Sequence, residues 1–256
     1  MSSHAGPRDW DAAVYDRVSQ PQAEWAQDVL ARLPLEGDET VLDAGCGTGS
    51  VTADLLQRVP RGRVIAVDAS PSMVERARER LGAGADVRLA DLVDLRLDER
   101  VDVVFSNAVF HWIADHERLF ARLHATLAPG GRLVAQCGGL GNVAALGGAI
   151  GRAAARPQFA PHLAGFEGMW NFAGPEETSE RLSRAGFTDV RCWLEPKHVR
   201  PDRPHDYLVA VTLGPHLARM PGELRDPFVD AVAAEAGEPL ELDYVRLNIA
   251  AVRVPA

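Results

Sequence analysis

One short stretch limits the fold of this chain more than any other. An apolar run from Val41 leads into a loop that has glycine at every second position, Gly45, Gly47 and Gly49. Glycine lets the backbone take positive φ angles and lets a ligand approach without meeting a Cβ atom. The helix expected from Ser50 offers backbone N–H groups that have no partner inside the helix. A strand, a glycine loop and a helix in this order predict a site for a nucleotide-type ligand.

The chain after this loop keeps alternating short apolar strands with helical segments. The run Val101–Ser106 is apolar almost throughout, which is typical of a strand in a sheet that is covered on both faces. The alternation predicts a doubly wound α/β fold with a mostly parallel sheet. The expected strands lie at 40–43, 63–68, 87–90, 101–106, 132–136, 187–194 and 242–252, and the expected helices at 50–59, 71–81, 115–127 and 176–185.

Local signals mark several ends of these elements. Ser70 followed by Pro71 is a typical helix start, because serine caps the N-terminus and proline fits the first helical position. Pro21 is expected to divide the first segment, 10–33, into two helical pieces. The turn Pro129-Gly130-Gly131 is expected to separate a helix from the strand that follows it.

We expect a single domain over residues 1–256, because a chain of 256 residues with 46% hydrophobic content can form one large core. Two helical or glycine-rich stretches interrupt the alternation and are interpreted as insertions over one end of the sheet. The expected parts are a helical cap at 10–33, a ligand-binding core at 38–137, lid insertions at 138–175 and 197–238, and a final strand at 242–252.

Composition argues against several classes of partner. The net charge is −9 and no basic stripe is present, so nucleic acid is disfavoured. No run reaches eighteen apolar residues and residues 1–9 lack an apolar signal region, so neither a membrane span nor export is expected. Cytoplasm is the expected location, with a small-molecule partner, and the sequence leaves the oligomeric state open.

Cysteine and histidine give no metal or disulfide pattern. Cys46, Cys137 and Cys192 form an odd and widely spaced set, which argues against a disulfide framework or a zinc site and indicates a reducing compartment. The histidines form no clustered ligand pattern, so no metal is expected.

Three kinds of nucleotide site compete for the glycine loop. A P-loop requires a lysine after its last glycine, and none follows Gly49. A dinucleotide site requires a third glycine where this chain has Ser50. It would also place Asp43 near a pyrophosphate, where a carboxylate opposes the phosphate charge. The charge suits instead a ligand with a cationic end, such as the ammonium group of an amino acid.

S-adenosylmethionine is a ligand of this kind, because it joins an adenosine without phosphate to a methionine with an ammonium group. Asp68, at the end of its strand, can accept hydrogen bonds from both ribose hydroxyls. Asp91 can accept from the adenine amino group, and Asn107 ends the next strand beside the glycine loop. Ligands of open α/β sheets bind at the carboxyl ends of strands, so the sequence predicts S-adenosylmethionine as the cofactor.

Four motifs follow one another within residues 38–137. They are Asp43-Ala44-Gly45-Cys46-Gly47-Thr48-Gly49, Val67-Asp68-Ala69-Ser70-Pro71-Ser72-Met73, Ala90-Asp91-Leu92 and Leu127-Ala128-Pro129-Gly130-Gly131. In this order they resemble the motifs of the class I S-adenosylmethionine-dependent methyltransferases. The resemblance implies a seven-stranded Rossmann-like sheet whose last strand is antiparallel and lies between the fifth and the sixth.

A finer resemblance concerns the acceptor side. Trp10-Asp11, Tyr15 and Phe110-His111-Trp112 are similar to the trans-aconitate methyltransferase group, which esterifies small carboxylic acids. The spacing from Tyr15 to Gln22, with His111-Trp112, is also similar to juvenile hormone acid methyltransferases.

The resemblance assigns cofactor-binding roles residue by residue. It implies that the methionine part is lined by Asp43, Gly45, Gly47 and Gly49, the ribose by Asp68, and the adenine by Met73, Leu92 and Asp91, with Asn107 near the sulfonium and Ala44, Cys46 and Ala69 completing the set.

The expected acceptor-binding residues are Tyr15, Gln22, His111, Trp112 and Trp170. An ionised carboxylate is nucleophilic at neutral pH, so an acid acceptor needs no base, and Gln22 or the Trp112 indole N–H could orient it. A hydroxyl or phenol acceptor would make His111 the candidate base. No other catalytic residue is assigned.

Several of these residues also have an ordinary structural interpretation, which the sequence leaves open. Asp91 could cap the turn after its strand, and Met73 could be core. His111 could be a buried, hydrogen-bonded histidine. Trp112 and Trp170 could be lid packing, and Gln22 and Tyr15 could be capping or surface residues.

The sequence therefore predicts a small-molecule methyltransferase that methylates a carboxylate oxygen. The alternatives are C- or N-methylation in natural-product biosynthesis, an NAD-dependent oxidoreductase, and a cofactor-binding protein that regulates another chain without catalysis. The sequence does not identify the acceptor, because only composition can be read from the cap and the lid insertions.

Overall fold

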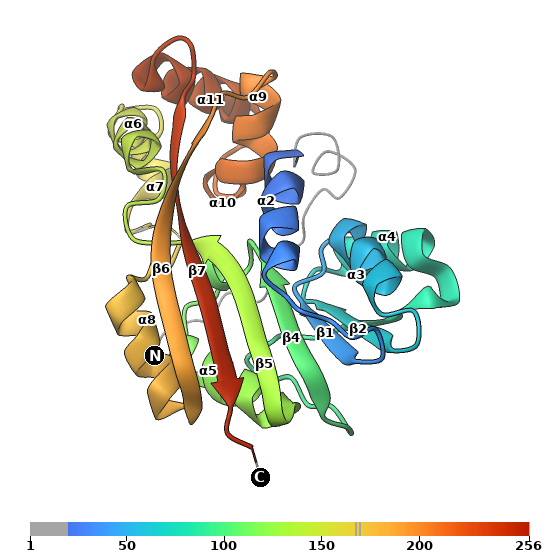
Figure 1. Cartoon of the computed structure of the whole chain (residues 1–256). Coiled ribbons are helices and arrows are strands. Elements are labelled where there is room, and N and C mark those ends of the chain that lie inside the picture. The colour runs from blue at the N-terminus through green and yellow to red at the C-terminus, as the bar shows by residue number, and fades with distance from the viewer. Residues whose placement is uncertain (1–19, 167, 169, 256) are drawn as a thin grey trace.

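The computed structural model describes residues 20–166, 168 and 170–255. Its centre is a seven-stranded sheet in the order β3-β2-β1-β4-β5-β7-β6 (Figure 1). The first five strands pair in parallel, and β7 pairs antiparallel with both β5 and β6. This confirms the predicted fold class and the place of the last strand. The strands are β1 Thr40–Ala44, β2 Arg63–Asp68, β3 Asp86–Leu89, β4 Val101–Asn107, β5 Leu127–Gly138, β6 Phe187–Val199 and β7 Leu242–Arg253.

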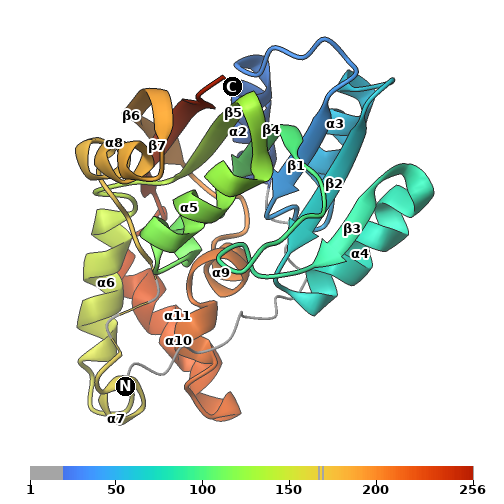
Figure 2. The same ribbon diagram turned by 90° about the horizontal axis from the view of Figure 1, so that it is seen from below.

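Helices cover both faces of the sheet (Figure 2). On one face α2 and α3 pack on strands β1, β2 and β4, and on the other α5 and α8 pack on strands β4, β5 and β7. A strand covered on both sides must be apolar throughout, which explains the composition of β4. The helices are α2 Gln20–Ala31, α3 Ser50–Arg58, α4 Pro71–Leu81, α5 His116–Thr126, α6 Ala144–Ala154, α7 Ala160–Leu163, α8 Pro175–Arg184, α9 Pro204–Tyr207, α10 Gly214–Leu217 and α11 Gly222–Ala236.

A second apolar core lies beyond the sheet, among α6, α7, α9, α10 and α11, which we call the lid helices (Figure 1). Phe159 and Phe228 are buried there with ring centroids 5.1 Å apart. Strand β5 ends at Gly138, which pairs with Arg246 of the antiparallel strand β7. Strand β7 begins four residues earlier, at Leu242, so the helices that precede it lie at the carboxyl end of β5. The lid helices therefore stand on the same edge of the sheet as the glycine loop.

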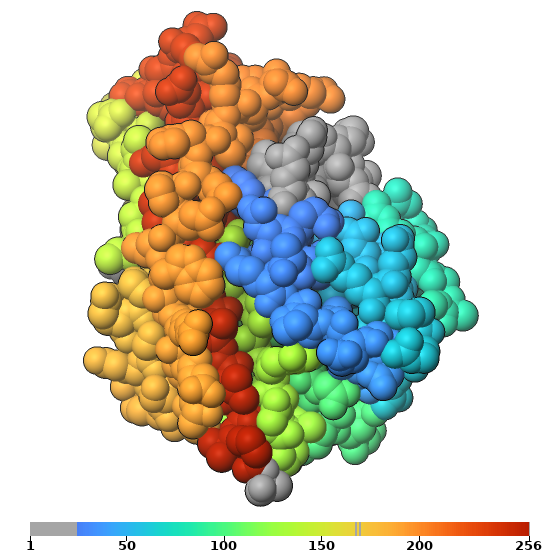
Figure 3. Space-filling model, in the orientation of Figure 1, coloured from blue at the N-terminus to red at the C-terminus, as the bar shows by residue number. Residues whose placement is uncertain are grey.

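Helix α2 joins the sheet to the lid helices. The Trp25 ring packs edge-on against Tyr244, and Asp28 forms an ion pair with Lys197 of β6 at 3.2 Å. Figure 3 shows α2 and β6 meeting on this face of the molecule. The predicted cap is thus seen in its second part, since residues 10–19 lie outside the described residues.

Pro21 lies in the first turn of the described part of α2, and because residues 10–19 lie outside the described residues, the division of 10–33 into two helical pieces stays a prediction. The structure differs from the sequence expectation at Pro129. The turn Pro129-Gly130-Gly131 lies inside β5: Leu127 already pairs with Val101, and pairing resumes at Arg132 after an irregularity. Proline and glycine at such an irregularity interrupt the ladder without ending the strand.

Two other segments also differ. Strand β6 continues past Leu194 to Val199 because it pairs with β7 over this whole length, so residues 195–199 lie in the sheet. In the insertion expected at 197–238, the helical part begins at Pro204, where α9 passes into a π-helical turn, Leu208–Thr212, and α10 follows. Strand pairing and packing decided these bounds, and the local pattern could not. The grouping of the lid insertions as a cover for the site stays a prediction.

Candidate functional site

The glycine loop is fixed to β2 through its backbone. The amides of Gly45 and Cys46 both donate to the Val67 carbonyl, at 2.8 and 2.9 Å. Gly45 and Gly47 have φ angles of 88° and 54°, which favour glycine. A Cβ on Gly45 would lie 2.1 Å from Val109 Cγ2, whereas a Cβ on Gly47 would meet nothing within 4 Å. Gly45 is thus required for packing, and Gly47 faces open space that a ligand could enter.

Asp43 lies under this loop at the end of β1, with 2% of its surface exposed. The Thr52 hydroxyl, in the first turn of α3, donates to its Oδ2 at 2.7 Å. Burial raises the pKa of Asp43 to about 7; the Thr52 hydrogen bond opposes this shift, and the charge of Asp68 adds to it. A cationic group nearby would hold this carboxylate in its charged form.

Asp68 ties the glycine loop to the start of α4. Its Oδ2 accepts from the Gly47 amide and its Oδ1 from the Ser70 amide, both at 2.9 Å. Burial raises the pKa of Asp68, although these backbone hydrogen bonds act in the opposite direction. A carboxylate oxygen can accept more than one hydrogen bond, so both oxygens can still accept from ribose hydroxyls. The predicted cap of α4 is confirmed, since the Ser70 side chain accepts from the Met73 amide.

The other predicted cofactor residues lie around the same strand ends. Asp91 follows β3, and its Oδ1 accepts from the Val93 amide at 3.1 Å, so one oxygen caps the turn as the structural interpretation expected. Asn107 ends β4 opposite Gln136 of β5. Of the remaining residues, Ala44, Cys46, Met73 and Leu92 are buried and Ala69 is half-buried.

His111 lies in the 3₁₀ turn Phe110–Trp112, between β4 and α5, and is buried. The Gly138 amide donates to its Nδ1 at 3.2 Å. Burial, followed by the charge of Arg246, holds the pKa of His111 well below its usual value. The ring is therefore neutral, and because Nδ1 accepts, its proton is on Nε2. In this tautomer His111 is a hydrogen-bond donor at Nε2, and Nε2 cannot take a proton as a base.

Aromatic rings gather around His111. Its ring centroid lies 5.1 Å from that of Trp112 and 5.8 Å from that of Phe172. Trp170 lies 6.2 Å from Trp112 and stacks on Phe172 at 5.4 Å. The structure thus brings three of the predicted acceptor residues together. Tyr15 lies outside the described residues, and Gln22 lies in α2 with its side chain outside them.

Sequence reasoning missed Arg246 of β7. Its guanidinium is 2% exposed, lies 4.7 Å from the Trp25 ring centroid, and donates through Nε to Gln136 at 3.3 Å. The alternating pattern of the last strand showed Arg246 and Asn248 on one face, which usually indicates a face in solvent. Helix α2 covers that face instead, and only tertiary structure reveals this. The charge of Arg246 acts on His111 and contributes to lowering its pKa.

His216 of α10 and Phe172 were also missed. The His216 ring lies 6.4 Å from that of Trp170, and burial lowers its pKa to about 4. Both residues belong to segments that carried no motif, so no sequence signal could have found them.

The residues at the strand ends fit S-adenosylmethionine. Open space at Gly47 admits a ligand, Asp68 retains acceptor capacity, and the raised pKa of Asp43 suits an ammonium partner. Within the described residues, no group of three or more His, Cys, Asp or Glu side chains could hold a metal ion. Over the same residues, none of the helices has the length and apolar character needed to span a membrane.

Comparisons with known proteins agree with this geometry. Residues 41–131 match the family model described as a methyltransferase domain. The trans-aconitate 2-methyltransferase of Methylobacterium radiotolerans is 41% identical over 128 residues, which are 50% of this chain and 49% of the relative. The chain therefore aligns with about half the length of the curated relatives it matches, and their acceptor does not follow from the match.

Solved structures agree on the fold. A phosphoethanolamine N-methyltransferase of Haemonchus contortus, solved with S-adenosylmethionine, superposes with a TM-score of 0.61 at 19% identity, covering 95% of this chain and 56% of that one. The [4+2]-cyclase SpnF superposes with a TM-score of 0.59 at 19% identity, covering 100% and 89%. The predicted methyltransferase domain and its cofactor, S-adenosylmethionine, are confirmed over the matched residues, and the cyclase shows that this fold by itself does not fix the reaction.

Proposed function

We propose that the whole chain is an S-adenosylmethionine-dependent methyltransferase that forms a methyl ester on the carboxylate of a small molecule. The observation that carries this proposal is the state of His111. A neutral ring whose Nδ1 is already an acceptor offers a proton at Nε2, where a base would have to receive one. Such a site suits an acceptor that arrives ionised, and a carboxylate does so at neutral pH.

The residues of the glycine loop and strand ends would hold the cofactor. Asp43 would face the ammonium group of the cofactor, Asp68 its ribose hydroxyls and Asp91 its adenine amino group. The open space at Gly47 lets the cofactor approach the backbone of the loop. When bound, S-adenosylmethionine supplies an electrophilic methyl group, and the chain supplies alignment and a dry pocket.

The acceptor would bind on the side of His111 and Trp112. The Nε2 proton of His111 can donate to one carboxylate oxygen, which leaves the other oxygen to react. The rings of Trp112, Trp170 and Phe172 exclude water from the carboxylate and provide an apolar surface for the body of the acceptor.

A labelling experiment tests the proposal. Purified full-length protein is incubated with S-adenosylmethionine carrying a labelled methyl group and with a panel of small acids and their neutral amides. We expect label in the acids and not in the amides, and alkaline treatment should release it as methanol, because methyl esters are cleaved by alkali whereas methyl ethers, amines and C-methyl groups are not.

Each alternative predicts a different result. Alkali-stable product would overturn ester formation and favour C- or N-methylation. Cofactor binding without methylation of any acid would contradict the proposal and favour a regulatory cofactor-binding protein. Tighter binding of a nicotinamide dinucleotide by an Asp43→Ala variant would favour the oxidoreductase.

A further inference from the structure

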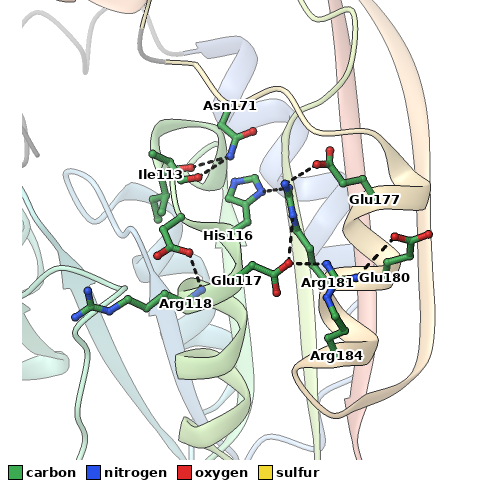
Figure 4. A network of polar contacts seen from close by, with 11 residues as sticks. Ile113, His116, Glu117, Arg118, Asn171, Glu177, Glu180, Arg181 and Arg184 are labelled. Atoms are coloured by element: carbon green, nitrogen blue, oxygen red, sulfur yellow. Dashed lines mark hydrogen bonds and ion pairs between the residues drawn. The ribbon is translucent and has the colours of Figure 1, made fainter. Parts of the chain in front are cut away.

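The turn that carries His111 and Trp112 is held firmly on its α8 side. His116 Nε2 lies 2.9 Å from the Phe110 carbonyl. On the other side of the ring, Arg181 lies 3.3 Å from His116 Nδ1 (Figure 4). A carbonyl can only accept, so the His116 proton is on Nε2, and Nδ1 accepts from the guanidinium. Burial lowers the pKa of His116 and keeps this ring neutral. These contacts anchor the turn to α8 without involving residues 170–172.

One residue holds the opposite side. The Asn171 amide donates to the His111 carbonyl at 2.8 Å. Its side-chain Nδ2 donates to the Ile113 carbonyl at 3.2 Å and to the Ala114 carbonyl at 3.1 Å (Figure 4). Backbone and side chain of a single asparagine thus supply three hydrogen bonds to the segment 111–114, with both hydrogens of the amide group in use.

The neighbours of Asn171 in sequence are two of the rings of the acceptor side. Trp170 faces Trp112, Phe172 faces His111, and the two rings stack on each other at 5.4 Å. Because Asn171 lies between them, its hydrogen bonds fix the position of both rings relative to the turn. The ring contacts between the two segments are less directional than these hydrogen bonds.

We infer that Asn171 is a positioning residue, which seats the segment 170–172 on the His111–Trp112 turn and thereby sets the affinity for the acceptor. The seating is independent of the reaction, whereas the effect on the acceptor rests on the proposed function. Asn171 touches neither cofactor nor reacting atoms in this interpretation, so its loss should change binding of the acceptor more than the rate of the bound complex.

Two variants remove the side-chain donors in different ways. Asn171→Leu removes the polar group, and Asn171→Asp keeps its shape but places a carboxylate against two carbonyls. In both, the KM for the acid acceptor should rise about tenfold, more in Asn171→Asp, because two hydrogen bonds are lost. We expect kcat to change less than about threefold and the Kd for S-adenosylmethionine to stay within about twofold. Amide hydrogen exchange should become faster in residues 110–114 and 170–173.

Arg152→Gln is the matched control within the lid helices. Arg152 donates to the Glu235 side chain at 2.8 Å and to its carbonyl at 2.9 Å, so this variant also loses two hydrogen bonds, but between α6 and α11. It should leave both the acceptor KM and exchange in residues 110–114 unchanged.

The outcomes separate the inference from the proposed function. Unchanged exchange in both Asn171 variants would overturn the seating, and an equal rise of KM in Arg152→Gln would show a general loosening of the lid helices instead. If wild-type protein methylates no acid but the Asn171 variants exchange faster at 110–114, the seating stands and the proposed function fails.

Discussion

The proposed site has two sides: a cofactor side, made of the glycine loop with Asp43 and Asp68, and an acceptor side, made of the His111–Trp112 turn with residues 170–172. The two sides are built from different interactions. On the cofactor side, backbone amides of the glycine loop donate to Val67 and to Asp68, and buried carboxylates set the charge. On the acceptor side, rings pack around His111, and side-chain hydrogen bonds from Asn171 position them. Backbone geometry tolerates almost no change, whereas ring packing can adapt to acceptors of different shape. A fold that serves several reactions requires a constant cofactor site beside an acceptor site that can vary.

The largest effect should come from the backbone of the cofactor side. Gly45→Ala places a Cβ 2.1 Å from Val109 Cγ2 at a φ of 88°. We expect it to destabilise the protein by about 2–4 kcal/mol and to abolish cofactor binding, from overpacking and backbone strain together. Denaturant unfolding and calorimetric titration measure both. Gly82→Ala is the control, since Gly82 also has positive φ but has nothing within 4 Å, so its cost comes from backbone strain alone and should be smaller than that of Gly45→Ala, with cofactor binding retained. Equal losses in the two variants would contradict the packing argument.

The charge of the cofactor side is tested by Asp43→Asn. The folded-state pKa of about 7 lies above the usual 3.8, so the folded protein holds a proton that the unfolded chain has lost, and ligand-free stability falls as pH rises between these values. The neutral amide of the variant would carry no such penalty. We therefore expect the variant to be more stable than wild type at pH 8 by about 1–3 kcal/mol and similar to it at pH 4, as measured by denaturant unfolding at the two pH values.

The affinity of Asp43→Asn for S-adenosylmethionine should be lower than that of wild type, although the variant is more stable at pH 8. Wild-type affinity for S-adenosylmethionine should rise as pH increases through 7, where Asp43 ionises, and the variant should bind about tenfold more weakly at pH 8 without this rise. A variant that keeps both the affinity and its pH dependence would remove Asp43 from the ammonium site.

The acceptor side is tested by His111→Phe, which keeps a ring but removes the Nε2 donor and also the Nδ1 acceptor of the Gly138 amide. The acid acceptor should show a KM about tenfold higher, because a hydrogen bond to a charged group is lost, with a smaller change in kcat. His124→Phe, a ring on α5 packed edge-on against Phe187, is the control and should leave KM unchanged. A fall of kcat by more than about 100-fold with unchanged KM would instead indicate a base.

The smallest effect is expected away from both sides. Thr178 of α8 is fully buried, and its hydroxyl oxygen has no hydrogen-bond partner among the described residues. Thr178→Val should stabilise the protein by about 1 kcal/mol in thermal unfolding, because it removes an unsatisfied polar group. Cofactor and acceptor kinetics should stay as in wild type, which gives a baseline for the other variants. A loss of stability would indicate a partner for this hydroxyl.

The sequence predicted the glycine loop and the Ser70 helix cap because their signals are local. Positive φ at Gly45 and the Ser70 cap follow from neighbouring residues, and the polar ends of parallel strands must meet at one edge of the sheet. The expectation was wrong where pairing overrides local preference, as in β5, which continues across Pro129-Gly130-Gly131.

What only the tertiary structure decided is the chemistry of the acceptor side. His111 is a donor because the amide of Gly138, on another strand, occupies its Nδ1, and its pKa is low because the ring is buried and Arg246 of β7 lies near it. Asn171 reaches the turn from a segment without a recognisable motif. The sequence by itself determined a glycine loop, a sheet and a cofactor type, since these depend on spacing along the chain. Proton positions and electrostatic effects depend on distances between residues that are far apart in the sequence, and only the folded structure sets these distances.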